Sequence, residues 1–204
     1  MKIGIDAKDL EGNRTGVGRY LLNLLKYWRG EDIVLYFKKE IPDLDLPFEK
    51  KVLNNSSNAW HMHFALPRAA KKDKVDLLFC PAYISPLFYS GKTALTLHDI
   101  VYEVRPEIYN WPSIWDKFLL KKVSKISARK ASVIFVPSEY SKKEIIEHYQ
   151  ISPDKICVTY LGVDQAIKSL GLKKKNFILW SSRLWKDFLC FNICGRITNT
   201  TIKC

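Results

Sequence analysis

The sequence predicts an α/β fold: a Rossmann-like, mainly parallel sheet with helices on both faces, followed by an atypical short tail. Two observations predict it. Short runs that are apolar throughout recur along the chain, and stretches with apolar residues at the 3.6-residue spacing of a helix separate several of them. Strands that are apolar on both sides and alternate with helices are typical of a parallel sheet that is covered on both faces.

The main apolar runs have the composition of buried strands, and most end at a residue that interrupts a strand. Pro81 and Pro137 end two of them, and His98 ends a third. Two further short strands are expected at residues 52–53 and 177–180. The main strands should begin near residues 2, 33, 75, 93, 132 and 156.

Helices are expected in the segments between these strands. Residues 17–28 place apolar side chains at helical spacing, so one face of this helix should be buried. Residues 59–72 also look helical, but Pro67 should kink or break that helix because proline lacks an N–H and clashes with the preceding turn.

Two more helices follow in the second half of the chain. One should end near Tyr149 and begin at Ser138 or at Ser141, since Ser141 and Glu144 have the spacing of a capping box. The other covers residues 113–130 and is strongly amphipathic. Its apolar side is expected to consist of Ile114, Phe118, Val123 and Ile126.

Three segments are expected in the domain organisation. Residues 1–165 form one domain, residues 166–180 are a linker and the start of a further domain, and residues 181–204 are an atypical tail. The tail has no helical period and no cap. We interpret it as a truncated or frame-shifted end that is disordered, and a genuine C-terminal extension is the alternative.

The composition is strongly basic, with 33 Lys and Arg against 21 Asp and Glu and a net charge of +12. The lysines are dispersed, which is typical of solvated helix faces and loops. An anionic membrane surface is the second interpretation. Nucleic acid is not expected as a partner, because the chain has no RNP motif and no zinc-finger spacing. The basic cluster expected to meet a membrane consists of Lys121, Lys122, Lys125, Arg129 and Lys130.

The cysteines and the first residues favour a cytoplasmic protein. An odd number of cysteines, without a signal-peptide core, indicates reduced thiols. Cys80 and Cys157 lie in strand-like runs and are expected in the core, whereas Cys190 and Cys194 lack the further ligands of a zinc site. The basic charge also suggests that the protein could bind peripherally at the inner face of the membrane.

Gly16-Val17-Gly18 stands at the start of the first helix. Glycines let backbone N–H groups approach a ligand closely, and a helix N-terminus favours negative charge. The segment therefore suits a phosphate or a sugar hydroxyl, and Arg19 could pair with an anionic group. Leu21 occupies the third glycine position of a dinucleotide fingerprint, so that site is not expected. An ordinary glycine turn is the alternative.

Two further strand ends carry polar residues. His98 and Asp99 directly follow a strand, where a neutral imidazole can bond a sugar hydroxyl and Asp99 can orient it or cap the next loop. Ser138 lies in a strand-to-helix turn and could meet a phosphate or simply cap the helix. The carboxyl ends of parallel strands meet at one edge of a sheet, so these residues should lie at the same edge as Gly16. Asp6 is more typical of a structural loop anchor than of a catalytic base.

Taken in order, several segments resemble the N-terminal domain of glycosyltransferase family 4, the group 1 glycosyltransferases of the GT-B fold. The resemblance spans roughly residues 2–180. No single segment is specific, but the ordered series is. The segments are Ile3–Asp6, Gly16–Tyr20, Leu97–Ile100, Val136–Lys142, Ile151–Ile156 and Leu161–Asp164.

The resemblance implies a two-domain enzyme that moves a sugar from a nucleotide-sugar to a sugar or lipid-linked acceptor. Transfer would retain the configuration of the sugar and would need no metal and no other cofactor. His98 would be the catalytic residue beside the transferred sugar, and Arg19 and Asp99 would face the acceptor. The donor phosphates and the cleft would be lined by Gly16, Val17, Gly18 and Ser138.

The chain departs from the resemblance after residue 180. The family's C-terminal domain binds the nucleotide and supplies basic residues and paired glutamates that stabilise the leaving diphosphate. The expectation is therefore that this chain alone is inactive in sugar transfer. Two alternatives stay open: a subunit of a split enzyme that a separate chain completes, and a non-catalytic basic module that binds membranes or other partners.

Overall fold

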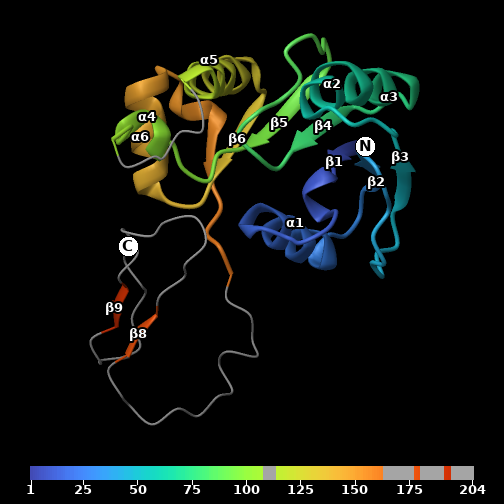
Figure 1. Cartoon of the computed structure of the whole chain (residues 1–204), viewed down its shortest axis with the longest axis horizontal. Coiled ribbons are helices and arrows are strands. Elements are labelled where there is room, and N and C mark those ends of the chain that lie inside the picture. Colours follow the sequence, from blue (N-terminus) through green and yellow to red (C-terminus); the bar gives the residue numbers. More distant parts are fainter. Residues whose placement is uncertain (108–113, 163–176, 180–190, 194–204) are drawn as a thin grey trace. The chain divides into compact units, whose positions relative to one another are not determined.

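The computed structural model describes residues 1–107, 114–162, 177–179 and 191–193. The chain divides into two units, Met1–Leu161 and Gly162–Cys204. The first unit holds a seven-stranded sheet in which every pair of neighbouring strands is parallel (Figure 1). This confirms the predicted fold class, a Rossmann-like parallel sheet with helices on both faces.

The strand order in the sheet is β3-β2-β1-β4-β5-β6-β7. The predicted strands are all present, and the short run near Val52 belongs to β3. The strands of the first unit are β1 Lys2–Asp6, β2 Asp32–Phe37, β3 Glu49–Val52, β4 Leu77–Cys80, β5 Lys92–Thr96, β6 Val133–Val136 and β7 Ile156–Val158.

The helices fall close to their predicted positions. They are α1 Gly16–Tyr27, α2 Asn58–Trp60, α3 Leu66–Lys72, α4 Val101–Val104, α5 Ile114–Lys130 and α6 Glu139–Tyr149, with the 3-10 turns η1 Lys8–Leu10 and η3 Pro153–Lys155 and the π turn η2 His61–Ala65. The short α4 and the turn η1 were not predicted, because neither is long enough to show a helical period. None of the helices in the described ranges is both long and apolar enough to cross a membrane.

Pro67 does not break its helix, contrary to the expectation of an interruption there. It is buried near the start of α3, and α2, η2 and α3 follow one another without a gap. Proline cannot donate to the carbonyl four residues earlier, and the π turn compensates. The Leu66 N–H donates to the carbonyl of His61, five residues back. The backbone therefore shifts its hydrogen-bond pattern just before the proline and continues.

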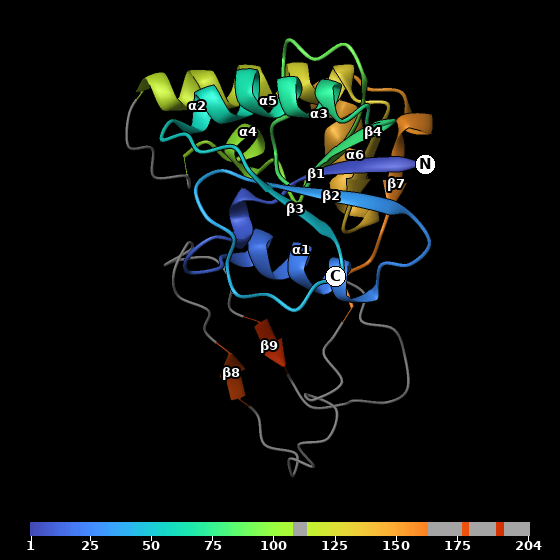
Figure 2. The same ribbon diagram turned by 90° about the vertical axis from the view of Figure 1, so that its right-hand side faces the viewer.

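The two faces of the sheet have different covers (Figure 2). Residues of α1 and η1, such as Leu21 and Leu10, pack with Ile5 and its neighbours on one face. Residues of α3, α4, α5 and α6, such as Ala70 and Ile145, pack on the other. Successive strand residues point to opposite faces, and both faces are apolar here, so the strands appear as continuous apolar runs in the sequence.

The buried side of α5 differs from the predicted one at Ile126, while the side chains of Ile114 and Phe118 lie outside the described residues. Ile126 is 38% exposed, whereas Ser124, Ser127 and Ala128 are fully buried. Small residues let the helix approach closely, and their hydroxyls find partners: Ser124 Oγ lies 2.6 Å from the Tyr102 hydroxyl, and Ser127 Oγ bonds the backbone of residue 85. Hydropathy alone placed Ile126 on the buried side, because serines count as polar even where they are buried.

Cys80 is buried as expected, but Cys157 is exposed, which corrects its assignment to the core. It lies in β7, the strand at the edge of the sheet. In the second unit, β8 Phe177–Leu179 pairs antiparallel with β9 Phe191–Ile193. The linker 166–180 and the tail 181–204 lie outside the described residues apart from these two strands, so their predicted character stays a prediction.

Candidate functional site

The strand order places a switch point between β1 and β4. From β1 the chain adds β2 and β3 on one side, and from β4 it adds β5, β6 and β7 on the other. Ligands of open α/β sheets bind outside the carboxyl ends of the strands at such a point. The loops there begin after Asp6 of β1 and Cys80 of β4. The strand ends that precede His98 and Ser138 lie along the same edge.

Gly16 and Gly18 have different roles although they are two residues apart. Gly16 is exposed, and an added Cβ would meet nothing within 4 Å. Gly18 is buried, and an added Cβ would lie 2.2 Å from the backbone oxygen of Asp9. Gly18 therefore lets α1 pack against η1. Gly16 and Val17 present the unbonded N–H groups of the first helical turn, which are suited to an anion.

His98 is held by contacts on both sides of its ring. Its Nε2–H donates to the carbonyl of Pro81 over 3.1 Å, so Pro81 fixes the tautomer. The Tyr20 ring meets it edge-on with centroids 4.9 Å apart. Burial lowers the pKa of His98 below its ordinary value, although Pro81, Asp99 and Asp9 oppose this. Near pH 7 the imidazole is therefore neutral, and Nδ1 is the nitrogen that can accept a hydrogen bond.

Asp99 caps the loop after β5 and does not hold the imidazole. Its Oδ1 accepts from the Val101 N–H over 3.1 Å, and its Oδ2 accepts from the Tyr83 hydroxyl over 3.3 Å. Of the two roles that the sequence left open, capping is the one that these bonds describe. Arg19, the other residue that is expected to face the acceptor, is exposed on the first turn of α1.

Ser138 is the N-cap of α6. Its Oγ accepts from the Ser141 N–H over 3.1 Å, and the two hydroxyls are also 3.1 Å apart. The side chain is half-buried at the carboxyl end of β6. Ser138 rather than Ser141 thus begins the helix, and its predicted contact with a phosphate stays a proposal.

Asp9 is a residue of this edge that sequence reasoning missed. Its Oδ2 is buried and, in the part of the chain that the structure describes, has no hydrogen-bond partner; it lies 3.6 Å from Lys8 Nζ. Burial raises the pKa of Asp9, and the charge of Lys8 opposes this only in part. No sequence pattern points to Asp9, because the turn η1 has only three residues.

A second His–Asp pair joins the end of β1 to η2, and the sequence analysis did not predict it. Asp6 Oδ1 accepts from His61 Nε2 over 3.0 Å, and Asp6 Oδ2 bonds Lys8 Nζ over 2.6 Å. Asn55 Nδ2 lies 3.4 Å from His61 Nδ1 and fixes the tautomer. Burial raises the pKa of Asp6, but Lys8 and His61 outweigh it and the net pKa is well below the usual range. Asp6 is thus an anchor, as predicted.

The basic cluster of α5 is bound within the first unit. Lys121 Nζ lies 3.3 Å from a Glu103 carboxylate oxygen, and Lys125 Nζ donates to the carbonyl of His148 over 2.9 Å. Arg129 donates to the Tyr149 carbonyl, and Lys130 Nζ to the Leu87 carbonyl. Lys121 is therefore paired with a carboxylate, whereas Lys125, Arg129 and Lys130 bond neutral carbonyls and keep their positive charge. These bonds fix α5 to its neighbours, and the expected contact of this cluster with a membrane stays a prediction.

We compared the chain with known protein families, curated proteins and solved structures. The family Glycosyltransferase Family 4 matches the chain over residues 14–166. No curated protein matches the chain. Among solved structures, HepE from Anabaena in complex with UDP is similar, with 15% identity and a TM-score of 0.51 over 81% of this chain and 45% of that one.

A glycosyltransferase from Rickettsia africae is similar too, with 19% identity and a TM-score of 0.50 over 84% of this chain and 46% of that one. At these identities the likeness shows the fold. The chain spans about half the length of these structures. The family match itself covers the glycine segment, His98 and Ser138, and the chain belongs to Glycosyltransferase Family 4.

Proposed function

We propose that the first unit is the acceptor-side half of a sugar-transfer site of the GT-B type, in a group 1 glycosyltransferase. The observation that carries the proposal is His98: a neutral imidazole beside the switch point, with Nε2–H committed to Pro81 and Nδ1 able to accept from a sugar hydroxyl. Gly16 and Val17 offer N–H groups to a phosphate at the same edge.

The proposed reaction transfers a sugar from a nucleotide-sugar to a hydroxyl of a sugar or lipid-linked acceptor. The bond between the anomeric carbon and the diphosphate oxygen breaks, and the electron pair leaves with the nucleoside diphosphate. The acceptor oxygen bonds the same face of that carbon, and its proton passes to the departing diphosphate. We propose that a second domain holds the nucleotide, and that Asp9, Arg19 and Asp99 lie on the acceptor side.

The first experiment is an NMR titration of the ¹⁵N-labelled chain. HepE was crystallised with UDP, so the probes are UDP, UDP-glucose and inorganic diphosphate. We expect millimolar binding, which corresponds to about 4 kcal/mol, with the largest amide shifts at Gly16, Val17 and His98. Shifts that map to the amino-end edge of the sheet would contradict the proposal.

Single-residue variants sharpen this titration. Gly16→Ala should weaken diphosphate binding, because the added methyl group stands where the anion would approach. Ser132→Ala is the control, since Ser132 is exposed and directly precedes β6, at the amino-end edge of the sheet. His98→Ala should reduce the response to UDP-glucose, and His98→Gln, which keeps an acceptor, should restore part of it. Equal responses in all four variants would exclude this edge.

A further inference from the structure

Three large aromatic side chains lie exposed together outside the site described above. The exposed fractions are 51% for Trp60, 38% for Phe64 and 74% for Phe88. The rings of Trp60 and Phe64 are stacked with centroids 4.7 Å apart, and those of Phe64 and Phe88 are 6.0 Å apart. They come from α2, η2 and the loop between β4 and β5, so a cluster rather than scattered single residues is exposed.

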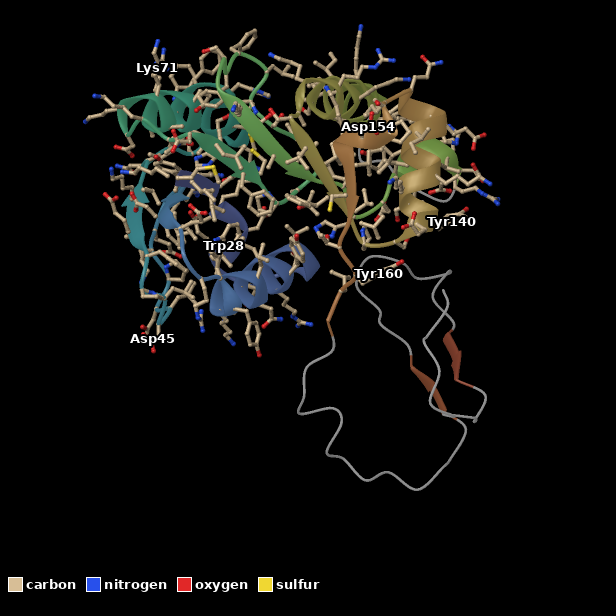
Figure 3. All side chains as sticks on the ribbon, turned by 180° about the vertical axis from the view of Figure 1, so that it is seen from behind. Trp28, Asp45, Lys71, Tyr140, Asp154 and Tyr160 are labelled. Carbon is tan, nitrogen blue, oxygen red and sulfur yellow. The ribbon has the colours of Figure 1, made fainter. Side chains whose placement is uncertain are left out.

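Basic side chains continue the same helical stripe. Arg68 is four residues beyond Phe64, and its guanidinium carbon lies 5.8 Å from the centroids of both the Trp60 and the Phe64 rings. Lys71 and Lys72 follow on the next turn and are exposed. Figure 3 shows Lys71 extending outward from its helix. We call this surface the aromatic–basic face: Trp60, Phe64, Arg68, Lys71, Lys72 and Phe88.

Acidic residues are missing from the segments that build this face. Residues 54–72 and 77–98 contain no Asp and no Glu. The nearest carboxylate in sequence, Asp73, is already bound by Tyr36 and Lys51, each over 2.7 Å. Among the described residues, Arg68, Lys71 and Lys72 form no ion pair with a carboxylate, whereas Lys121 of α5 is paired with Glu103.

The face is held in place by bonds between its parts. The Leu87 N–H donates to His63 Nδ1 over 3.3 Å, which joins the aromatic loop to η2, and Lys130 Nζ donates to the Leu87 carbonyl from the end of α5. Helices α2, α3 and α5 lie in one layer on the same side of the sheet (Figure 2). Leu119 and Ile126 of α5 are exposed on that layer as well.

We propose that the aromatic–basic face docks on a bilayer that contains anionic lipids. Trp and Phe favour the boundary between headgroups and acyl chains, and Arg and Lys bind lipid phosphates while their stems stay in apolar surroundings. The positive charge of the face complements the lipid charge, and each cation contributes about 1 kcal/mol, or about fivefold in affinity. Docking does not require the transfer activity proposed above.

The test is co-sedimentation of the full chain with phosphatidylcholine vesicles, with and without phosphatidylglycerol. The wild-type chain should bind the anionic vesicles at least tenfold more tightly than the neutral ones, and high salt should weaken this binding. Changing Trp60, Phe64 and Phe88 together to Ala should abolish most of it. Changing Arg68, Lys71 and Lys72 together to Glu should weaken binding to anionic vesicles at least tenfold.

A matched control uses exposed aromatics elsewhere in the first unit. Tyr27 and Tyr140 are 80% and 67% exposed, and the pair Tyr27→Ala with Tyr140→Ala should bind as the wild-type chain does. Circular dichroism checks that all variants stay folded. The aromatic triple variant should lose some thermal stability, because Phe64 is only 38% exposed and stacks on Trp60.

Tryptophan fluorescence gives a second readout that needs only one single-residue variant. Brominated lipids should quench the tryptophan fluorescence of the wild-type chain, and Trp60→Phe should remove most of that quenching while binding persists. Three results would each overturn the proposal: wild-type binding by the aromatic triple variant, equal loss in the Tyr27 and Tyr140 control, or self-association through this face without vesicle binding.

Discussion

This protein has two His–Asp pairs, one in the loop after β5 and one that joins the end of β1 to η2, and they differ in their bonds and in their burial. His98 and Asp99 are adjacent in sequence, yet each bonds other groups, Pro81 for the histidine and Tyr83 for the aspartate. His61 and Asp6 are 55 residues apart and bond directly within the interior. The comparison teaches that the hydrogen-bond partners, rather than sequence adjacency, decide what a His–Asp pair does.

Burial separates the two pairs as well. The side chains of Asp6 and His61 are 1% and 0% exposed, and Lys8, which is 20% exposed, compensates the charge of Asp6. His98 and Asp99 are only partly buried, at the edge where the glycine segment lies. The first pair therefore contributes to stability, and the second is the pair for which we propose ligand binding.

The largest expected effect breaks the interior pair. Asp6→Ala leaves Lys8 and His61 without their common acceptor, and breaking a buried ion pair in this way costs about 3–5 kcal/mol. Asp99→Ala is the control, since it removes two partly buried hydrogen bonds and should cost about 1 kcal/mol. Urea unfolding of both variants measures the difference, and equal losses would contradict the assignment of roles.

The next prediction compares Gly18, which allows helix packing, with Gly16, which we propose is approached by a ligand. Gly18→Ala forces a Cβ to 2.2 Å from the Asp9 backbone oxygen, so α1 and η1 must move apart, at a cost of about 1–3 kcal/mol. Gly16→Ala should change the free energy of unfolding by less than about 0.5 kcal/mol. Thermal unfolding compares them. If Gly18→Ala were as stable as the wild-type chain, η1 would have to move away from α1 at little energetic cost.

A smaller effect concerns the third strand end. Ser138→Ala removes the cap of α6 and should cost about 1 kcal/mol, whereas Ser138→Gly should cost only a few tenths. Thermal unfolding gives the cap contribution, and the diphosphate titration of the same two variants gives the ligand contribution. A change in binding that is equal in both variants and exceeds the stability change would favour the phosphate role over capping alone.

Local signals explain why so much of the fold followed from the sequence. Strands such as β6 are short apolar runs stopped by proline, and α6 begins at a serine whose hydroxyl can bond the backbone. The candidate edge followed for the same reason, because it depends only on which residues come directly after strands. His98 and Ser138 were accessible to this argument, and Gly16 was found from its place at the start of the first helix.

Contacts between distant segments explain the rest. The bond between Asp6 and His61 joins β1 to η2 and has no local signature. Asp9 lies in a three-residue turn, and its partly satisfied carboxylate is a property of packing. On α5, Ile126 was wrongly expected on the buried side, because Ser124 and Ser127 are buried there through hydrogen bonds that hydropathy does not register.

The smallest expected effect tests the charge of the accessible histidine. Burial lowers the pKa of His98, against the opposing effects of Pro81, Asp99 and Asp9. An unfolded histidine titrates near about 6.5, so below that pH the unfolded chain binds a proton that the folded chain excludes. The free energy of unfolding must therefore fall as the pH drops through this range, by linkage.

His98→Gln removes this dependence and should lose less stability than the wild-type chain between neutral and mildly acidic pH. The other three histidines are common to both proteins, and their contributions cancel in the difference. Urea unfolding across the pH range measures it. A larger loss in the variant would mean that the pKa of His98 is raised in the folded chain, so that a charged imidazolium, and not a neutral acceptor, faces the ligand at this edge.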